Sequence, residues 1–376
     1  MVGARVRFLL ALAAVLLAAS SALAAAPPKV GGRAYLVIDA ASGETLLARH
    51  ERERVPIASI TKLMTVLVTL EHAKLDDVVT VKHRAAEVGE SSIYLVSGEQ
   101  LTVRELVEAA LIQSANDAAV ALAQYVGHGS VGAFVRMMNA KARALGLTDT
   151  HFANPDGLDE AGHYSSARDV TTLAEVAMRN PFVRSVVRRR TAHISGRELH
   201  TWNDLLSTFP GLIGVKTGHT SSAGWSQVAA ARGRGVTIYA TLLGEPSRSR
   251  RNTDLSRLLV YGLDQYRVVP IVSPGRVYAS ARLPYGKKAV DIVATRRIVR
   301  ALRVDRPLRE RVVVADTVSL PVEKGQRLGE LRVYDLGKLI AIEPLVASRS
   351  VARPGLLGRV RWYATKTVEH IWDWFT

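Results

Sequence analysis

Three short stretches decide the fold of this chain: Ser59-Ile60-Thr61-Lys62, Ser114-Ala115-Asn116 and Lys216-Thr217-Gly218. Each could arise by chance, because Ser-x-x-Lys is common and Ser-x-Asn is less specific still. Together and in this order they supply an acylable serine, two lysines, a bridging hydroxyl and amide, and a segment able to hold a carboxylate. Their value therefore depends on the structural elements that carry them.

The first stretch is predicted to open a largely buried helix. Pro56 stops an extended segment just before Ser59, and apolar residues then recur at helical spacing through position 70. Ser59 is therefore expected in the first turn, with Lys62 three residues later on the same face. Upstream, residues 33–39 and 44–48 are predicted to form two strands joined by a tight turn.

The second stretch is predicted to lie between two helices. Thr102-Val103-Arg104-Glu105 is a capping box, which starts a helix that runs to about Gln113. Another apolar helical pattern begins after Asp117 and ends near Gly127. Ser114 to Asn116 therefore occupy a tight junction between these helices. Further helical patterns cover residues 133–145 and 167–178.

The third stretch falls where the periodicity changes from helix to strand. Residues 212–216, 225–231 and 236–243 are predicted as successive strands, with Arg232 to Gly235 as a hairpin turn. Residues 254–266 return to a helical pattern. Helices thus pack against an antiparallel sheet whose strands come from both ends of the region, which is an α+β fold.

The C-terminal third is predicted to form a separate small domain. The composition shifts between Pro270 and Pro274, helical periodicity disappears, and short β-rich runs at 311–315, 331–334 and 339–342 alternate with Gly and Pro turns. This describes an all-β domain of about 75 residues. We expect four parts, at residues 1–24, 25–268, 269–350 and 351–376.

Both ends of the sequence suggest a location at the cell envelope. Arg5 and Arg7 precede an apolar run over residues 8–19 and small residues at Ala22 to Ala24, which is the pattern of a secretory signal cleaved after Ala24 or Ala26. The last segment is predicted to be an amphipathic helix that contacts a membrane surface; a helix docked on the protein itself is the alternative. Its apolar arc contains Leu356, Leu357, Val360, Ala364, Val368, Ile371, Trp374 and Phe375, whereas Trp362 falls on the polar side.

The chain is strongly basic and has no cysteine. Its 50 Lys and Arg against 34 Asp and Glu give a net charge of +16, with arginine clusters at 188–190, 248–251 and 296–297. Export removes nucleic acid as a partner, which leaves anionic lipid headgroups or cell-wall polymers. Each cluster is equally explained as a solvated surface. The absence of cysteine excludes disulfides, thiolate catalysis and cysteine metal sites.

The residue types of the three stretches fit nucleophilic acyl transfer. Ser59 needs a base to take its proton, and Lys62 can act only as a neutral amine. Burial and a second ammonium, that of Lys216, are both expected to depress the pKa of Lys62. Ser114 can relay a proton between the lysines and the departing amine, and Asn116 can anchor the substrate amide.

Substrate recognition is assigned to the third stretch. Lys216 and Thr217 together can hold a terminal carboxylate, and Gly218 lets a substrate backbone lie close to the strand. An oxyanion needs two backbone donors, and the N–H groups of Ser59 and His219 are the candidates.

With these motifs in place, the chain resembles the low-molecular-mass penicillin-binding proteins, specifically the serine D-alanyl-D-alanine carboxypeptidases of bacterial cell walls. Residues 151–158 (HFANPDGL), 166–169 (SARD) and 216–220 followed by Ala223-Gly224 also match. The resemblance implies a transpeptidase/β-lactamase-like domain that removes the terminal D-alanine from peptidoglycan pentapeptides through an acyl-enzyme on Ser59.

The same resemblance assigns the individual roles. It makes Lys62 the proton acceptor, Ser114 the second catalytic serine and Lys216 the contact for the substrate carboxylate. β-Lactams would acylate Ser59 as substrate mimics. No metal or organic cofactor is implied. The protein would lie at the periplasmic face of the cytoplasmic membrane, as a peripheral component.

Three alternatives remain open at this stage. A class A β-lactamase shares the three stretches and needs a glutamate to activate water, for which Glu160 is the candidate. A catalytically inert envelope protein that binds peptidoglycan would keep the same residues. An endopeptidase that cuts D-alanyl cross-links differs only in substrate reach. Asn154, Asp156, His163 and Asp169 are assigned to the scaffold.

Overall fold

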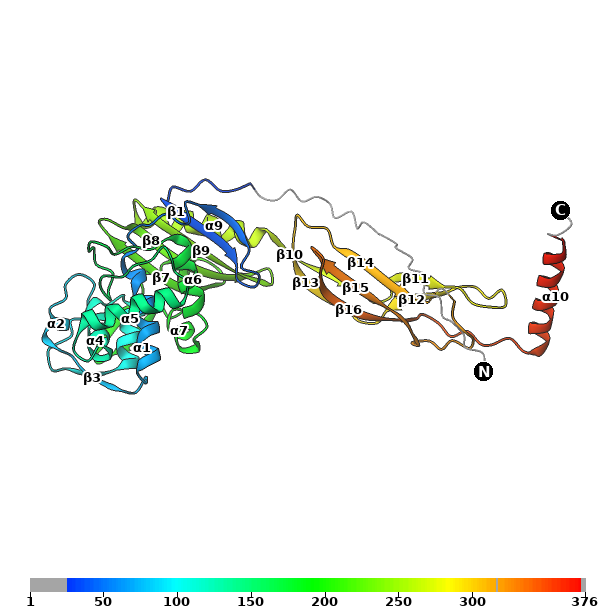
Figure 1. Cartoon of the computed structure of the whole chain (residues 1–376), viewed down its shortest axis with the longest axis horizontal. Coiled ribbons are helices and arrows are strands. Elements are labelled where there is room, and N and C mark those ends of the chain that lie inside the picture. Colours follow the sequence, from blue (N-terminus) through cyan, green and yellow to red (C-terminus); the bar gives the residue numbers. More distant parts are fainter. Residues whose placement is uncertain (1–25, 316, 373–376) are drawn as a thin grey trace. The chain divides into compact units, whose positions relative to one another are not determined.

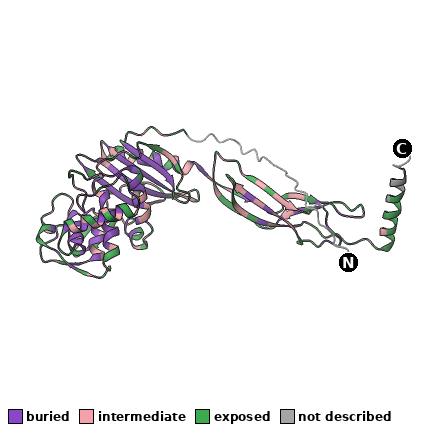
Figure 2. Cartoon of the chain, viewed as in Figure 1, coloured by how far each residue is buried: buried purple, intermediate pink, exposed green. Residues whose placement is uncertain are grey.

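The computed structural model describes residues 26–315 and 317–372, so the predicted signal segment lies outside the described residues. The chain divides into two compact units, the first ending at Tyr266 and the second beginning at Arg267 (Figure 1). Buried residues are dense in the first unit, whereas exposed and intermediate residues dominate the strands of the second (Figure 2).

The first unit is built on a five-stranded antiparallel sheet with the strand order β2-β1-β9-β8-β7. The N-terminal strand β1 pairs directly with β9, so strands from both ends of the unit form one sheet, and the predicted α+β class is confirmed. Arg234 and Gly235 both have positive φ angles and join β8 to β9 by a two-residue hairpin turn, as predicted. The strands are β1 (Ala34–Asp39), β2 (Thr45–Arg49), β7 (Leu212–Thr220), β8 (Gly224–Gly233) and β9 (Val236–Glu245).

Helices cover both faces of this sheet because adjacent residues of each strand point to opposite sides. Leu36 of β1 belongs to the main core with the helical cluster, whereas Val37 packs with Leu255 and Leu258 of α9 on the other face. The principal helices are α1 (Lys62–His72), α3 (Val103–Ile112), α4 (Asn116–Val126), α5 (Val131–Ala144), α6 (Ala167–Ala177) and α9 (Arg248–Asp264).

Most predicted helices are confirmed, and the capping box is present in full. Thr102 Oγ1 accepts a hydrogen bond from Glu105 N at 3.2 Å, and the Glu105 carboxylate accepts one from Thr102 N at 2.8 Å. The prediction was wrong about the start of α9. The helix begins at Arg248, six residues before the predicted start at position 254, and Ser247 caps it. The first turn of α9 is polar and arginine-rich, so apolar periodicity does not mark it.

Short elements escaped prediction because they offer too few residues for a periodic pattern. They are α2 (His83–Ala86), α7 (Pro181–Val186), α8 (Leu205–Thr208), β3 (Val78–Thr80), β4 (Gln100–Thr102), β5 (Thr191–Ile194) and β6 (Arg197–His200).

The second unit contains an all-β fold, as predicted. A five-stranded sheet has the order β11-β12-β16-β15-β14, and β10 pairs with β13. Ile292, Leu331 and Leu345 are among the fully buried residues of its own core. The strands are β10 (Tyr266–Val272), β11 (Val277–Ala281), β12 (Val290–Ala294), β13 (Ile298–Arg303), β14 (Arg309–Val314), β15 (Arg327–Asp335) and β16 (Lys338–Ala347).

A last helix, α10 (Leu356–Trp372), follows the β strands. Leu356, Leu357 and Val360 of the predicted apolar arc are 74, 88 and 62% exposed. Trp362, which the helical projection places on the polar side, contacts the edge of the Tyr285 ring at a centroid distance of 5.5 Å. That contact explains the apparent misfit of Trp362.

Within the described part of the chain, no single helix has the length and apolarity needed to cross a membrane. Only α4 and α5 taken together reach the threshold by length and composition, and they are bent by 89° at the break between them.

Candidate active site

The three sequence stretches meet in one place in the first unit. The Lys62 ammonium donates a hydrogen bond to Ser59 Oγ at 2.8 Å, and the Lys216 ammonium donates one to Ser114 Oγ at 2.8 Å. The 3-10 turn η1 (Ala58–Thr61) carries Ser59, the α3–α4 junction carries Ser114, and β7 carries Lys216. Two serine–lysine pairs are thus brought together by the fold, although Ser114 and Lys216 are 102 residues apart along the sequence.

Ser59 lies in a 3-10 turn, not in the first turn of an α-helix as predicted. The turn is held between two other segments at very close range. A Cβ on Gly157 would lie 2.0 Å from Ala58 O, and one on Gly218 would lie 2.6 Å from Ile57 O. Gly218 therefore lets β7 approach the Ser59 turn, a role that the sequence analysis assigned to contact with the substrate.

Strained backbone marks the same region. Ala58, Glu90 and Ser114 have φ angles of +48°, +63° and +67°, a range that residues with a Cβ seldom adopt. Each such residue costs on the order of 1–2 kcal/mol, which the surrounding packing must offset. Ser114, and Ala58 directly before Ser59, are thus held in backbone conformations that an unconstrained chain would avoid.

Lys62 is completely buried and has three hydrogen-bond partners. Besides Ser59 Oγ, its ammonium donates to Asn116 Oδ1 at 2.7 Å and to the carbonyl oxygen of Asp156 at 2.6 Å. Burial lowers the pKa of Lys62 to about 8, against the opposing influence of the Asp156, Asp117 and Glu90 carboxylates. About a tenth of the amine is therefore neutral at pH 7 and able to accept a proton.

Lys216 is also buried, and its ammonium donates to Ser114 Oγ and, at 3.0 Å, to Thr217 O. Burial lowers its pKa well below the ordinary value, and the charges of Lys62 and Arg251 lower it further. The repulsion that the sequence analysis assigned to Lys62 thus acts on Lys216, while desolvation is the cause at Lys62.

Asn116 has protein partners for both ends of its side-chain amide. Its Oδ1 accepts from Lys62, and its Nδ2 donates to Gly89 O at 3.1 Å. The neighbouring Asp117 carboxylate accepts backbone N–H groups from Ile93 and Leu95. Loop 89–95 is therefore fastened to the start of α4, a clamp that sequence periodicity could not indicate.

A cavity of about 340 Å³ opens over Ser59. Glu90, Ser91 and Ser114 line one side, and Thr217, Gly218 and His219 of β7 line the other. Neither Lys62 nor Lys216 reaches its surface, since both are buried beneath it.

Three side chains in this cavity were missed by the sequence analysis: Trp202, Trp225 and Arg251. Arg251 is 1% exposed, lies 5.7 Å from the Trp225 ring centroid and donates to Asn252 Oδ1 at 2.6 Å. Burial lowers its pKa to about 10, so it remains a cation. The arginine cluster at 248–251 is thus the start of α9, with one member turned into the cavity and not into solvent.

The loop over residues 151–165 lies behind the Ser59 turn and is tied down by its own side chains. Asn154 Oδ1 accepts from Gly157 N, Asp156 Oδ1 accepts from Leu158 N, and His163 bonds Thr61 Oγ1 at 2.7 Å. Asp169 likewise accepts from Asp149 N and Thr150 Oγ1. These contacts agree with the scaffold roles expected of them.

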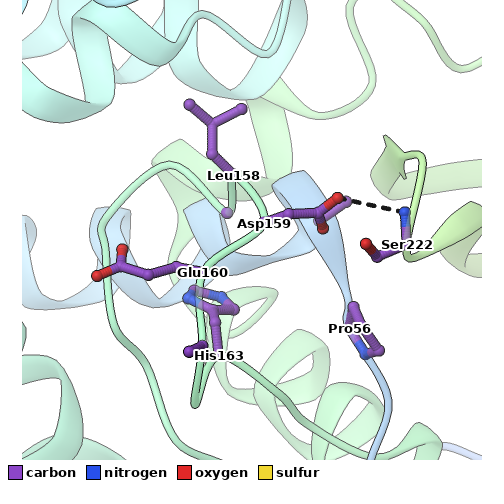
Figure 3. A pocket seen from close by; sticks show the side chains of 9 residues that line it. Pro56, Leu158, Asp159, Glu160, His163 and Ser222 are labelled. Atoms are coloured by element: carbon purple, nitrogen blue, oxygen red, sulfur yellow. Dashed lines mark hydrogen bonds between the residues drawn. The ribbon is translucent and has the colours of Figure 1, made fainter.

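A second cavity lies beside this loop (Figure 3). Asp159 accepts hydrogen bonds from Thr220 Oγ1 at 2.7 Å and Ser222 N at 3.2 Å, and these lower the pKa of Asp159 although partial burial opposes them. Glu160 points away from Asp159, and its carboxylate accepts from Asn154 Nδ2 at 2.9 Å. Glu160 therefore belongs to this second cavity and not to the one over Ser59.

Among the described residues, no group of three or more His, Asp and Glu side chains is placed to hold a metal ion. A serine hydrogen-bonded to a buried lysine of depressed pKa, with a second serine–lysine pair beside it, is the arrangement that a lysine-activated serine acyl-transferase requires.

Comparison with known proteins narrows this class. Residues 21–247 match the peptidase S11 family, described as D-alanyl-D-alanine carboxypeptidase, and residues 266–353 match the C-terminal domain of penicillin-binding protein 5. The chain belongs to the D-alanyl-D-alanine carboxypeptidase family. It is accordingly a serine-type hydrolase of the low-molecular-mass penicillin-binding group, and neither the class A β-lactamase nor the catalytically inert binding protein raised from sequence is favoured.

Similar proteins span almost the full length of the chain. D-alanyl-D-alanine carboxypeptidase DacF of Bacillus subtilis is 30% identical and aligns over 86% of this chain and 87% of its own. DacD of Salmonella typhimurium is 32% identical, with 95% of both covered. Penicillin-binding protein 5 of Haemophilus influenzae superposes with a TM-score of 0.63 at 27% identity, covering 88% of this chain and 100% of its own.

Proposed function

We propose that this protein removes the C-terminal D-alanine from peptidoglycan pentapeptides through an acyl-enzyme on Ser59. The observation that carries the proposal is the 2.8 Å contact between Lys62 Nζ and Ser59 Oγ, in which a buried amine of pKa about 8 faces the nucleophile. Such an amine is basic enough to accept the hydroxyl proton and neutral often enough to do so at physiological pH.

Acylation begins when neutral Lys62 accepts the Ser59 proton and Oγ attacks the carbonyl carbon of the penultimate D-alanine. The negative charge moves to the carbonyl oxygen, and we assign its stabilisation to the N–H groups of Ser59 and His219. The close approach of Gly218 to the Ser59 turn supports this assignment, because a Cβ added at Gly218 would lie 3.2 Å from Ser59 N.

The tetrahedral intermediate collapses when its C–N bond breaks and the leaving D-alanine takes a proton on its amine. We assign this proton to the Ser114 hydroxyl, which Lys216 reprotonates through their 2.8 Å hydrogen bond. Asn116 orients Lys62 throughout, and its remaining Nδ2 hydrogen is available for the substrate amide.

We assign recognition of the terminal carboxylate to the cationic end of the cavity. Thr217 and Arg251 line it directly, while Lys216 lies behind them and adds positive potential. Before deacylation the proton that Lys62 took from Ser59 leaves its amine and replaces the one that Lys216 gave up, so that Lys62 is neutral again. Lys62 then accepts a proton from the water that attacks the acyl-enzyme, and this proton passes to Ser59 Oγ as the acyl C–O bond breaks. A β-lactam follows the same acylation, but its leaving nitrogen stays tethered to the acyl group.

Two of the alternatives are distinguishable on structural grounds. The Glu160 carboxylate is bonded to Asn154 in a separate cavity, so it is not available to activate water as a β-lactamase requires. An inert binding protein would have no reason to keep strained backbone and two buried lysines at this site, since both are costly.

We further propose that the protein is exported by a signal in residues 1–24 and held at the membrane surface by α10. Support for the second part comes from Leu356, Leu357 and Val360, which are all exposed while Trp362 contacts the turn at Tyr285. This arrangement leaves the apolar arc of the described part of the helix without a partner in the unit to which it belongs.

The decisive experiment is mass spectrometry of a pentapeptide digest. Release of a single D-alanine is expected with the wild-type protein, and none with Ser59→Ala. Labelling with a fluorescent penicillin provides the control, because stable labelling that disappears in Ser59→Ala fits the carboxypeptidase. Rapid turnover of the label would instead favour a β-lactamase.

A further inference from the structure

The second unit holds most of the net positive charge of the chain, and the proposed mechanism does not use it. Residues 267–353 contain 18 Lys and Arg and 8 Asp and Glu, a net charge of +10 within 87 residues, out of +16 for the whole sequence. This net charge already includes the acidic residues that form ion pairs, such as Glu310, which pairs with Arg276 at 2.9 Å. Such an excess of exposed cations concentrates anions near the surface.

Three of these arginines line one cavity of about 400 Å³ between residues 296–300 and β16. Arg296 is fixed by the fully buried Glu343, at 2.8 Å from its carboxylate. For Arg297 and Arg300, the residues that the structure describes offer no carboxylate within ion-pair distance. The guanidinium groups of Arg297 and Arg300 thus line the same cavity as Arg296 without a carboxylate of their own among the described residues. This arrangement favours an anionic ligand.

The cavity also runs along a part of β16 that pairs, among the described residues, on one side alone, with β15, although β16 lies inside the sheet between β12 and β15. Ala294 of β12 pairs with Leu345 of β16, and the pairing stops there within the described residues. The strands are antiparallel, so the residues after Ala294 run beside those before Leu345, where Ala341 and Ile342 line the cavity. Unpaired backbone at a strand edge is suited to an extended peptide.

We propose that this arginine cavity binds peptidoglycan stem peptides through their carboxylates. The inference rests on the proposed function, since the stem peptides that Ser59 would act on end in a carboxylate both before and after removal of D-alanine and stay in the wall polymer. Guanidinium groups bind carboxylates in a bidentate manner, and an extended peptide fits the open strand edge. Holding the polymer at this unit raises the local concentration of uncleaved peptides for Ser59.

A membrane fits this cavity less well than a peptide does. The site is concave, whereas a bilayer presents a broad surface that Trp and Tyr side chains contact at the headgroup level. The exposed apolar residues in the cavity are Val299 and Ile342, 38 and 49% exposed, and no aromatic residue lines it. The aromatic and apolar residues expected at a bilayer lie in α10 instead.

The test is co-sedimentation of the full chain with purified peptidoglycan sacculi. All proteins carry Ser59→Ala, so that the polymer is not turned over during the assay. The double variant Arg297→Ser/Arg300→Ser is compared with Arg309→Ser/Lys324→Ser, which removes the same charge from exposed positions outside the cavity. We expect the apparent Kd to rise about five- to tenfold for the cavity variant and less than about twofold for the control.

Chemical amidation of the sacculi is expected to abolish the difference between the two variants, because it removes the carboxylates. Equal losses in both variants, or full binding to amidated sacculi, would overturn the proposal. A loss confined to anionic phospholipid vesicles would also overturn it, and would make the cavity a lipid contact.

Activity on a soluble pentapeptide, measured with Ser59 intact, separates this inference from the proposed function. Both double variants should retain wild-type activity there. Absence of activity in the wild type would refute the carboxypeptidase assignment, while the sacculus comparison would still decide whether the arginine cavity binds the wall.

Discussion

The two units of this protein use positive charge in opposite ways. Residues 25–266 contain 27 Lys and Arg and 24 Asp and Glu, a net charge of +3 in 242 residues, whereas residues 267–353 carry +10 in 87. Yet the first unit has the chemically altered cations: Lys62, Lys216 and Arg251 are all at most 2% exposed. In the second unit, Arg296 is 69% exposed at its side chain although it pairs with a buried glutamate.

The contrast teaches that burial, and not the number of charges, creates reactivity. Desolvation is the largest cause of the lowered pKa at each of the three buried cations. Exposed arginines keep their ordinary charge and can serve only to attract and bind anions. The net charge of the whole chain comes mainly from the second unit, so it gives no indication of the buried cations in the first.

The strongest test of this contrast removes a buried amine. We expect Lys62→Ala to slow acylation of Ser59 by about 10²–10⁴-fold, because general-base assistance is lost. Stopped-flow or gel-based labelling with fluorescent penicillin measures the rate. The matched control is Arg309→Ser, an exposed cation of the second unit, which should label at the wild-type rate. Similar rates for Lys62→Ala and the wild type would refute the assigned base.

Acidification should imitate that substitution in a graded manner. Lys62 must be neutral to act, so the acylation rate is expected to rise with pH and to level off above its pKa of about 8. Between pH 8 and pH 6 the neutral fraction falls about fiftyfold, from about one half to about one hundredth. The pH dependence of penicillin acylation checks this, and a flat profile over that range would contradict it.

Packing around the nucleophile is the next feature to perturb. In Gly218→Ala the new methyl group would lie 2.6 Å from Ile57 O, so β7 must move away from the Ser59 turn. We expect acylation to slow by at least about tenfold, since small displacements of reacting groups are costly. Gly132→Ala is the control, because its nearest contact is 3.9 Å away. An equal effect at both positions would argue against the close approach.

Another buried titratable group should affect stability and leave the chemistry unchanged. Burial lowers the pKa of His163 to about 4, so below pH 6.5 the unfolded chain takes up a proton that the folded protein does not. The neutral form of His163 therefore contributes to the free energy of unfolding above pH 6.5. This contribution is lost as the pH falls toward 4, by about 3 kcal/mol in all. Urea unfolding at pH 7.5 and pH 5 measures it. A pH dependence that is unchanged in His163→Gln would contradict the assignment.

The smallest effect on activity is expected from removal of α10, near the C-terminal end of the sequence. Truncation after Arg353 removes α10 and should leave acylation of Ser59 unchanged while abolishing binding to phospholipid vesicles. Vesicle flotation and penicillin labelling of the same sample measure the two properties. A truncated protein that still floats with the vesicles would show that the membrane contact lies elsewhere.

Local sequence was a reliable guide where a residue acts through its immediate neighbours. The capping box at Thr102, the hairpin turn at Arg234-Gly235 and the lysine three residues after Ser59 were all predicted, because each is set by spacing within one turn. The polar first turn of α9 was not, since it has no apolar period to reveal it. Arg251 lies in this turn, so its place in the lining of the cavity over Ser59 was not predicted either.

The sequence by itself determined the reactive groups and their order: two serines, two lysines, and the helices and strands that carry them. Only the tertiary structure decided that burial lowers the pKa of Lys62, that Asn116 and the Asp156 carbonyl bond its amine, and that Arg251 faces the cavity while Glu160 does not. The physical reason is that a pKa and an orientation depend on what surrounds a side chain on all sides, and most of those neighbours come from distant parts of the chain.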